Sequence, residues 1–157
     1  MEASFIIFRV NPYFENFGKR VIKSPKYYFT EVGLLIYLLE IETAKQVQRD
    51  PLVGHIFENL IVIECLKARL NQGKQANLYF FRDSNQNEID LIYKHENQMQ
   101  AIEIKSAMTY HPSLTKNLHK SESFLPESKG HLIYNGESRK HKGIQLLHFK
   151  DTHKAIK

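Results

Sequence analysis

Three charged side chains in one stretch of the chain have the types and spacing of a metal-assisted catalytic site. Asp90 lies in the segment EIDLIY, and Glu103 and Lys105 lie in AIEIKS. Both segments alternate polar and apolar residues with a period of two, the pattern of half-buried β-strands. Carboxylate oxygens are the ligands that Mg²⁺ prefers, and an amine beside them can orient water or a phosphate oxygen. The stretch is therefore a candidate site for phosphodiester hydrolysis.

The two segments predict an antiparallel hairpin, because only the short polar segment KHENQ separates them. Strict alternation places Asp90 on one face with Glu88 and Ile92, and it places Glu103 beside Lys105. The carboxylates and the amine can then converge on one side of a sheet. Charged outer faces are also ordinary on strands that do no chemistry, so a purely structural interpretation stays open.

A third carboxylate comes from a helix predicted over residues 51–70. Asp50 is the predicted N-cap, and Pro51 the predicted first helical residue. Glu58 falls on the same helical face as apolar residues such as Ile61, where an unpaired charge would be costly. We therefore expect Glu58 to reach the site of the strand carboxylates, to reach water, or to be bonded to a buried basic group.

The composition favours one folded domain with an acidic partner. The 157 residues are 42% hydrophobic and 25% charged, which excludes a disordered chain, and the formal net charge is +5. A basic protein favours partners such as nucleic acid. Cys65 is the single cysteine, so no intrachain disulfide can form and a reducing compartment is expected. No apolar run is long enough to cross a bilayer and no secretory signal pattern opens the chain, so we expect a cytoplasmic protein without membrane contact.

Two basic segments are candidates for contacts with the phosphates of nucleic acid. The alternative is that both are solvated loop faces. The residues concerned are Lys19, Arg20, Lys23 and Lys26 in the first segment, and Arg139, Lys140 and Lys142 in the second.

The remaining patterns predict a mixed α/β fold. Residues 137–143 are expected to form an exposed basic turn, and the polar tail 151–157 is expected to fray. Strands are predicted over residues 4–10, 78–81, 88–93, 101–105, 130–134 and 144–149, with a short buried helix over 32–40 and an amphipathic helix over 112–124.

The order of these elements resembles the core of the PD-(D/E)xK nucleases. Glu58 would lie on the first core helix, Asp90 on the second strand and Glu103-x-Lys105 on the third. The resemblance implies a restriction-endonuclease-like core, a mixed β-sheet flanked by helices. It also implies catalytic roles for these four residues. Asp90, Glu103 and Glu58 would hold Mg²⁺ or Mn²⁺, and DNA would be the substrate.

A second resemblance covers the chain from about Phe5 to Phe149. The segments PYFENFGKRVIKSPKYYFTEVGLLIYLL, GHIFENLIVIECLK, YFFRDSNQNEIDLIY and AIEIKS are similar to the C-terminal uncharacterised domain of prokaryotic AAA-type ATPases. Glu31 stands where that family usually has Asp. The resemblance implies an ATPase module as a partner. No GxxxxGK[ST] phosphate loop occurs in these residues, so the chain alone is not expected to hydrolyse ATP.

Together these observations predict three regions and leave two functions open. Residues 1–50 would form an N-terminal extension toward the ATPase module, residues 51–150 the nuclease-like core, and residues 151–157 a tail. The first hypothesis is a metal-dependent nuclease acting on DNA. The second is a nuclease-like scaffold without turnover, which would bind DNA or protein and regulate the ATPase.

Overall fold

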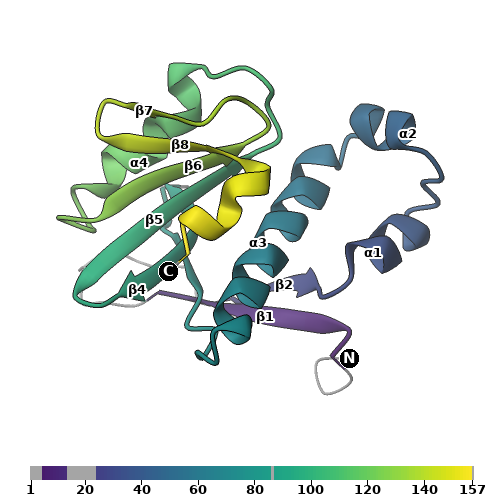
Figure 1. Cartoon of the computed structure of the whole chain (residues 1–157), viewed down its shortest axis with the longest axis horizontal. Helices are drawn as coiled ribbons and strands as arrows, with labels where there is room; N and C mark the ends of the chain where they lie inside the picture. Colours follow the sequence, from purple (N-terminus) through teal and green to yellow (C-terminus); the bar gives the residue numbers. More distant parts are fainter. Residues whose placement is uncertain (1–4, 14–23, 86, 157) are drawn as a thin grey trace.

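The computed structural model describes residues 5–13, 24–85 and 87–156, and within these residues eight strands form one mixed sheet (Figure 1). The strand order is β2-β1-β3-β4-β5-β6-β8-β7. The strands are β1 (Ile7–Pro12), β2 (Lys26–Phe29), β3 (Tyr79–Arg82), β4 (Glu88–His95), β5 (Gln98–Lys105), β6 (Lys129–Tyr134), β7 (Arg139–His141) and β8 (Ile144–His148).

The helices precede, interrupt and follow the central strands. They are α1 (Val32–Leu38), α2 (Ala44–Arg49), α3 (Val53–Asn71) and α4 (Lys116–Ser121), with the 3₁₀ turns η1 (Pro112–Thr115) and η2 (Phe149–Lys154). Strands β3, β4 and β5 form an antiparallel meander, and β6 lies parallel to β5 after the crossover through η1 and α4. The fold is therefore mixed α/β, with α3, the meander, α4 and β6 in succession.

Helices cover both faces of the sheet, and each face has its own apolar cluster. The cluster beneath α3 and η2 includes Cys65 of α3 itself together with Tyr93 and Ile102, all buried. Beside α4, Phe81 stacks on Phe124 with ring centroids 4.2 Å apart. Burying this apolar surface on both sides is what holds the central strands in place.

Strand β4 departs from the strict alternation that the sequence predicts. Ile89 and Ile92 pack in the cluster beside α4, whereas Leu91 packs in the cluster beside α3. The pairing of β3 with β4 explains this. Between the pairs Phe81–Ile89 and Tyr79–Ile92, β4 spans three residues whereas β3 spans two, so β4 holds one extra residue. Such a β-bulge re-aims side chains, and here it falls at Asp90 and Leu91. The prediction that Asp90 and Ile92 follow one uninterrupted alternation is therefore wrong.

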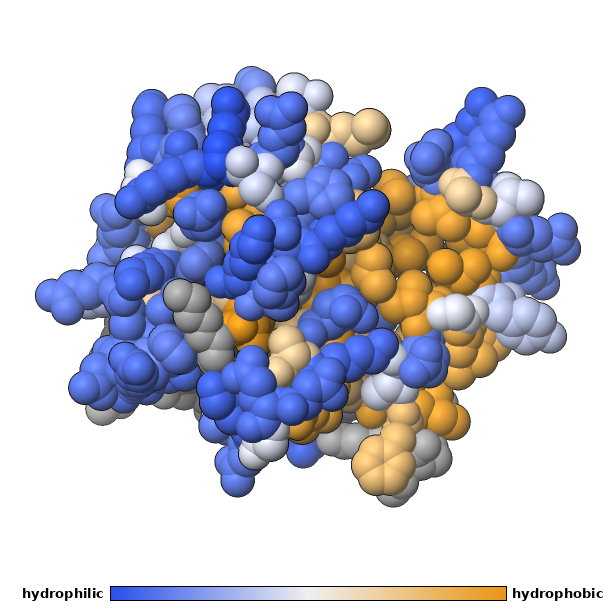
Figure 2. All heavy atoms as spheres, viewed as in Figure 1, coloured by the Kyte–Doolittle hydropathy of each residue, from blue (hydrophilic) through white to orange (hydrophobic). Residues whose placement is uncertain are grey.

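The prediction of a buried helix over residues 32–40 is also wrong. Helix α1 forms, but none of its residues is buried, and Leu34, Tyr37 and Leu38 are exposed. The reason is its position at the edge of the molecule, where it packs against β2 and α3 (Figure 1). Figure 2 shows an apolar surface in this part of the molecule.

Three local details differ from the predictions. The turn predicted over residues 137–143 contains β7, which pairs with β8 through a tight turn at Lys142 and Gly143, both with positive φ. Helix α3 begins at Val53, later than the predicted start at Pro51. Asp50 caps the preceding turn instead, since its Oδ1 accepts the Leu52 N–H at 2.7 Å. The predicted helix over 112–124 is divided between η1 and α4.

The C-terminal segment is docked rather than frayed. Ala155 and Ile156 are each only 2% exposed and belong to the cluster beside α3. The Tyr93 hydroxyl donates a hydrogen bond of 2.7 Å to the carbonyl of Ala155. The two apolar residues near the end of a polar segment were enough to anchor it.

We predict that Ile156→Ala lowers the free energy of unfolding by about 2–4 kcal/mol, because it leaves a cavity in the core. Urea denaturation measures this difference. The control is Lys154→Ala, which removes only an exposed ion pair with Asp151 and should cost about 0.5 kcal/mol or less. Equal small effects of both changes would contradict the docked tail.

Candidate active site

Lys105 joins the two strand carboxylates of the predicted site. Its Nζ lies 2.9 Å from Asp90 Oδ2 and 2.7 Å from Glu103 Oε2. Asp90 Oδ2 also accepts the backbone N–H of Ile104 at 2.8 Å. The Asp90 side chain is 9% exposed and that of Glu103 is 1% exposed. The hairpin therefore brings both carboxylates to one ammonium group in a largely dehydrated position.

Burial and mutual repulsion favour a proton on this cluster. Burial raises the pKa of Glu103 to about 8, and the charge of Asp90 adds to that rise. Burial also raises the pKa of Asp90, although Lys105 and the Ile104 N–H oppose it. Burial alone would lower the pKa of Lys105, but the two carboxylates outweigh it and raise that pKa. Lys105 is thus a permanent cation.

One oxygen of the cluster accepts no well-formed hydrogen bond from the described residues. This atom, Glu103 Oε1, is buried, and the Asn117 amide lies near enough to the Glu103 carboxyl group to oppose the rise of its pKa. A buried carboxylate oxygen without a donor is costly, so the position favours either a proton or an added cation.

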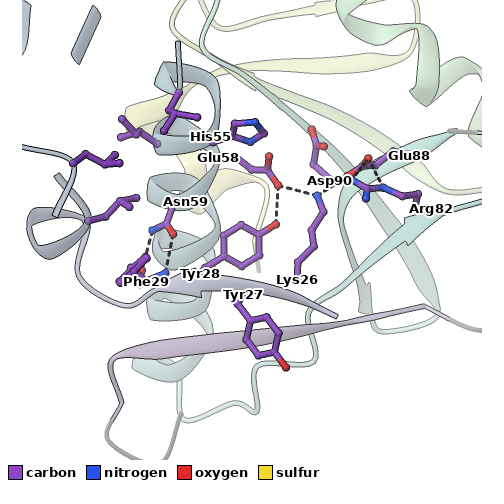
Figure 3. A pocket seen from close by; sticks show the side chains of 14 residues that line it. Lys26, Tyr27, Tyr28, Phe29, His55, Glu58, Asn59, Arg82, Glu88 and Asp90 are labelled. Carbon is purple, nitrogen blue, oxygen red and sulfur yellow. Dashed lines mark hydrogen bonds and ion pairs between the residues drawn. The ribbon is translucent and has the colours of Figure 1, made fainter. Parts of the chain in front are cut away.

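Glu58 faces a pocket of about 480 Å³ that Asp90 also lines (Figure 3). Its side chain projects from α3 and is 18% exposed. Glu58 Oε1 accepts a hydrogen bond of 2.7 Å from the Tyr28 hydroxyl and pairs with Lys26 Nζ at 2.9 Å. Of the alternatives open for Glu58 from the sequence, the structure shows a partly buried basic partner and a position on the same pocket as Asp90.

Two further charged residues belong to this pocket and were not recognised in the sequence. Glu88, at the start of β4, pairs with Lys26 Nζ at 2.5 Å and with the guanidinium of Arg82 at 2.7 Å. Burial opposes ionisation, yet the two cations outweigh it and lower the pKa of Glu88. The signal was available, because Glu88 lies two residues before Asp90 in the same alternating strand.

The basic residues predicted to contact phosphate lie in different surroundings. Lys26 is engaged in the pocket, where burial would lower its pKa but Glu58 and Glu88 raise it. Arg139 lies on β7 with its guanidinium 5.4 Å from the ring centroid of Tyr110. Lys140 and Lys142 are exposed beside it. The remaining three, Lys19, Arg20 and Lys23, lie outside the described residues.

The donor set fits a hard divalent cation, although the carboxylates are held by cations of the chain itself. Among residues 5–13, 24–85 and 87–156, no three His, Cys, Asp or Glu side chains are already arranged around a common metal position. Among the described residues, four carboxylates pair with three cations, and the raised pKa of Glu103 favours a proton that completes the charge balance. A divalent cation would replace that proton, and all-oxygen donors suit Mg²⁺ or Mn²⁺.

The fold and the site define a mixed α/β domain with a carboxylate–lysine cluster at the edge of a pocket. The chain belongs to the family described as "Domain of unknown function (DUF4143)", whose model matches residues 53–152. Residues 1–45 match a second model, "Domain of unknown function (DUF8612)".

The chain is similar to two mycobacterial proteins. These are "Uncharacterized protein Rv2008c" of Mycobacterium tuberculosis and "Uncharacterized protein Mb2031c" of Mycobacterium bovis. Each is 31% identical over 136 residues, which cover 87% of this chain and 30% of the relative. The chain therefore spans less than a third of the length of these relatives. No solved structure shows a significant match.

In the part of the chain that the structure describes, no helix combines the length and apolar character needed to cross a membrane.

The pKa of Glu103 predicts a pH dependence of stability. Because this pKa rises from 4.5 to about 8 on folding, the folded state holds a proton that the unfolded state releases across that window. The free energy of unfolding should therefore fall as the pH rises through it. Glu103→Gln keeps the shape without the titration, so it should lose less stability than the parent between about pH 5 and pH 8. We expect a difference on the order of 1–3 kcal/mol.

Urea denaturation at the two pH values measures this difference. Glu64→Gln, on the exposed side of α3, is the matched control and should follow the parent. Parallel pH dependences of the parent and Glu103→Gln would show that Glu103 does not carry the proton.

Proposed function

We propose that this domain is a divalent-metal-dependent nuclease that hydrolyses phosphodiester bonds of DNA. The observation that carries the proposal is the Lys105 ammonium held by both Asp90 and Glu103. A cluster that served only to stabilise the fold would not need a second, almost fully buried carboxylate with an unpartnered oxygen.

The topology supports the same proposal. Helix α3, the antiparallel meander β3-β4-β5, helix α4 and the parallel strand β6 follow one another as expected for a PD-(D/E)xK core. Glu58, Asp90 and the Glu103–Lys105 pair lie on the first helix, the second strand and the third strand of that order. The bulge in β4 at Asp90 is also a feature that recurs beside active sites.

The residues divide into proposed metal ligands and a hydrogen-bond donor. Asp90 and Glu103 would hold the cation, and Glu58 would reach it from α3 across the pocket. A bound Mg²⁺ or Mn²⁺ would polarise the scissile phosphate and make hydroxide available near neutral pH. Lys105 cannot act as a base, because its neighbours raise its pKa. It would instead donate hydrogen bonds to the attacking water or to a phosphate oxygen.

DNA is the proposed substrate because the chain is basic and carries exposed cations away from the cluster. The net charge is +5, and Arg139, Lys140 and Lys142 are exposed around the β7–β8 turn. The mycobacterial relatives are more than three times as long as their aligned region. We propose that the domain works beside a further module, an ATPase in the family that the sequence resembles.

A non-catalytic scaffold is the second candidate function, and one observation favours it. Each carboxylate is already paired with a cation of the chain itself, with Lys26 on Glu58 and Glu88, and Lys105 on Asp90 and Glu103. A domain stabilised in this way could serve as a binding module for DNA or for a protein. The two candidates differ in their response to metal.

We predict that Mn²⁺ raises the melting temperature of the parent and that Asp90→Asn abolishes this rise, because the change removes a ligand. Asp90→Asn also relieves repulsion with Glu103, so in EDTA it should melt no lower than the parent. Thermal melts in EDTA and in Mn²⁺ measure both effects. A plasmid-nicking assay with purified protein should detect cleavage by the parent and none by Asp90→Asn.

Asp151→Asn is the control, because it removes one carboxylate paired with Lys154 away from the pocket. It should keep the metal response and the nicking activity. The scaffold alternative predicts no metal response in the parent and a destabilised Asp90→Asn, since Lys105 loses a partner. A metal response without cleavage would contradict nuclease activity for the isolated chain.

A further inference from the structure

Lys26 lines the pocket and is a cation that the chain supplies itself. Its Nζ lies 2.9 Å from Glu58 Oε1 and 2.5 Å from Glu88 Oε1. The Lys26 side chain is only 18% exposed, so these ion pairs are shielded from water on most sides. In Figure 3 the ammonium group of Lys26 lies between Glu58 and strand β4, which carries Glu88 and Asp90. A positive charge is thus already present where carboxylates from α3 and β4 converge.

The protein scaffold, and not only the carboxylates, holds Lys26 in this position. Strand β2 carries it, and the β1–β2 ladder sets Lys26 opposite Val10. The ammonium also lies 5.4 Å from the ring centroid of Phe80 on β3. Lys26 comes from the segment that matches the second family model, whereas Glu58 and Glu88 come from the segment that matches the first. The N-terminal segment therefore delivers a counter-ion into a pocket built by the rest of the domain.

Each carboxylate that Lys26 contacts keeps another donor. The Tyr28 hydroxyl donates to Glu58 Oε1 at 2.7 Å, and Arg82 holds Glu88 Oε2. Glu58 and Glu88 would therefore remain oriented toward the pocket if the ammonium left. Two oriented carboxylate oxygens in a partly dehydrated pocket form a position for a cation, and Lys26 is the cation found there.

We propose that Glu58 and Glu88 form a cation subsite that Lys26 fills, and that Lys26 competes there with a divalent cation. This inference rests on the proposed metal-dependent function, and it adds Glu88 as a ligand and the N-terminal segment as a control on metal binding. The competition follows from charge, because an ammonium bonded to Glu58 repels a second cation on the same carboxylate. Withdrawal of Lys26 from the pocket would open the subsite.

The test is the affinity for Mn²⁺ of the 157-residue chain and its variants, measured by isothermal titration calorimetry. Lys26→Met keeps an unbranched apolar side chain beside Phe80 but removes the charge. We expect it to bind Mn²⁺ at least about tenfold more tightly than the parent. Lys67→Met is the matched control, since it removes one lysine charge from an exposed pair with Glu64 on α3. It should bind Mn²⁺ like the parent.

A double variant, Lys26→Met with Glu88→Gln, shows whether the gain depends on the subsite, because Glu88 belongs to the subsite and not to the Asp90–Glu103 site. It should lose the tighter binding, because one carboxylate of the subsite is gone. Lys26→Gln also removes the charge but keeps a polar side chain, and it should also bind Mn²⁺ more tightly than the parent. Far-UV circular dichroism and melting curves establish that each variant is folded.

The outcomes separate this inference from the proposed function. Tighter binding by Lys26→Met that vanishes in the double variant supports the inference, including where the parent binds no measurable Mn²⁺. Equal affinities of the parent and Lys26→Met would overturn the inference while leaving the metal-dependent function in place. Absence of Mn²⁺ binding by every variant would overturn both. A weaker affinity in Lys26→Met would show that Lys26 supports the metal site rather than competing with it.

Discussion

The ion pairs of Lys105 with Asp90 and Glu103 set the main constraint on this structure. Burying two carboxylates carries a large desolvation cost, and one ammonium compensates only part of it. The hairpin must therefore hold all three side chains in a fixed relation, with the Ile104 N–H adding a donor to Asp90. The raised pKa of Glu103 reflects the part of the desolvation cost and of the repulsion from Asp90 that the ammonium does not compensate. A site with this imbalance is unfavourable for stability, and we propose that a bound cation relieves it.

Three features of the rest of the fold support that arrangement. Apolar clusters on both faces fix β4 and β5, and the bulge in β4 changes the side-chain phase at Asp90. Helix α3 presents Glu58 to the same pocket. The N-terminal strands extend the sheet beyond β3 and place Lys26 against Glu58 and Glu88. Residues from both family segments thus meet in one charged pocket.

The sequence predicted the local elements better than their surroundings. Period-two alternation identified the hairpin that carries Asp90 and Glu103. The position of Glu58 on an apolar helical face indicated that its carboxylate needs the strand site, water or a basic partner. The bulge was not predictable, because it depends on the register with β3. Burial of Ile156 and exposure of Tyr37 were missed because hydrophobicity does not reveal which neighbours cover a segment. Lys26 was expected to face phosphate, since its long-range pairing with Glu58 leaves no local pattern.

The most direct measurement is a crystal structure of the chain grown with Mn²⁺, with anomalous diffraction recorded near the manganese absorption edge. We expect an anomalous peak within bonding distance of oxygens of Asp90 and Glu103, with Glu58 directed toward it. At least one of the two Lys105 ion pairs should then be broken. A structure at saturating Mn²⁺ that lacks a peak at these oxygens and retains both Lys105 ion pairs would contradict the account. The cluster would then be a structural ion-pair network.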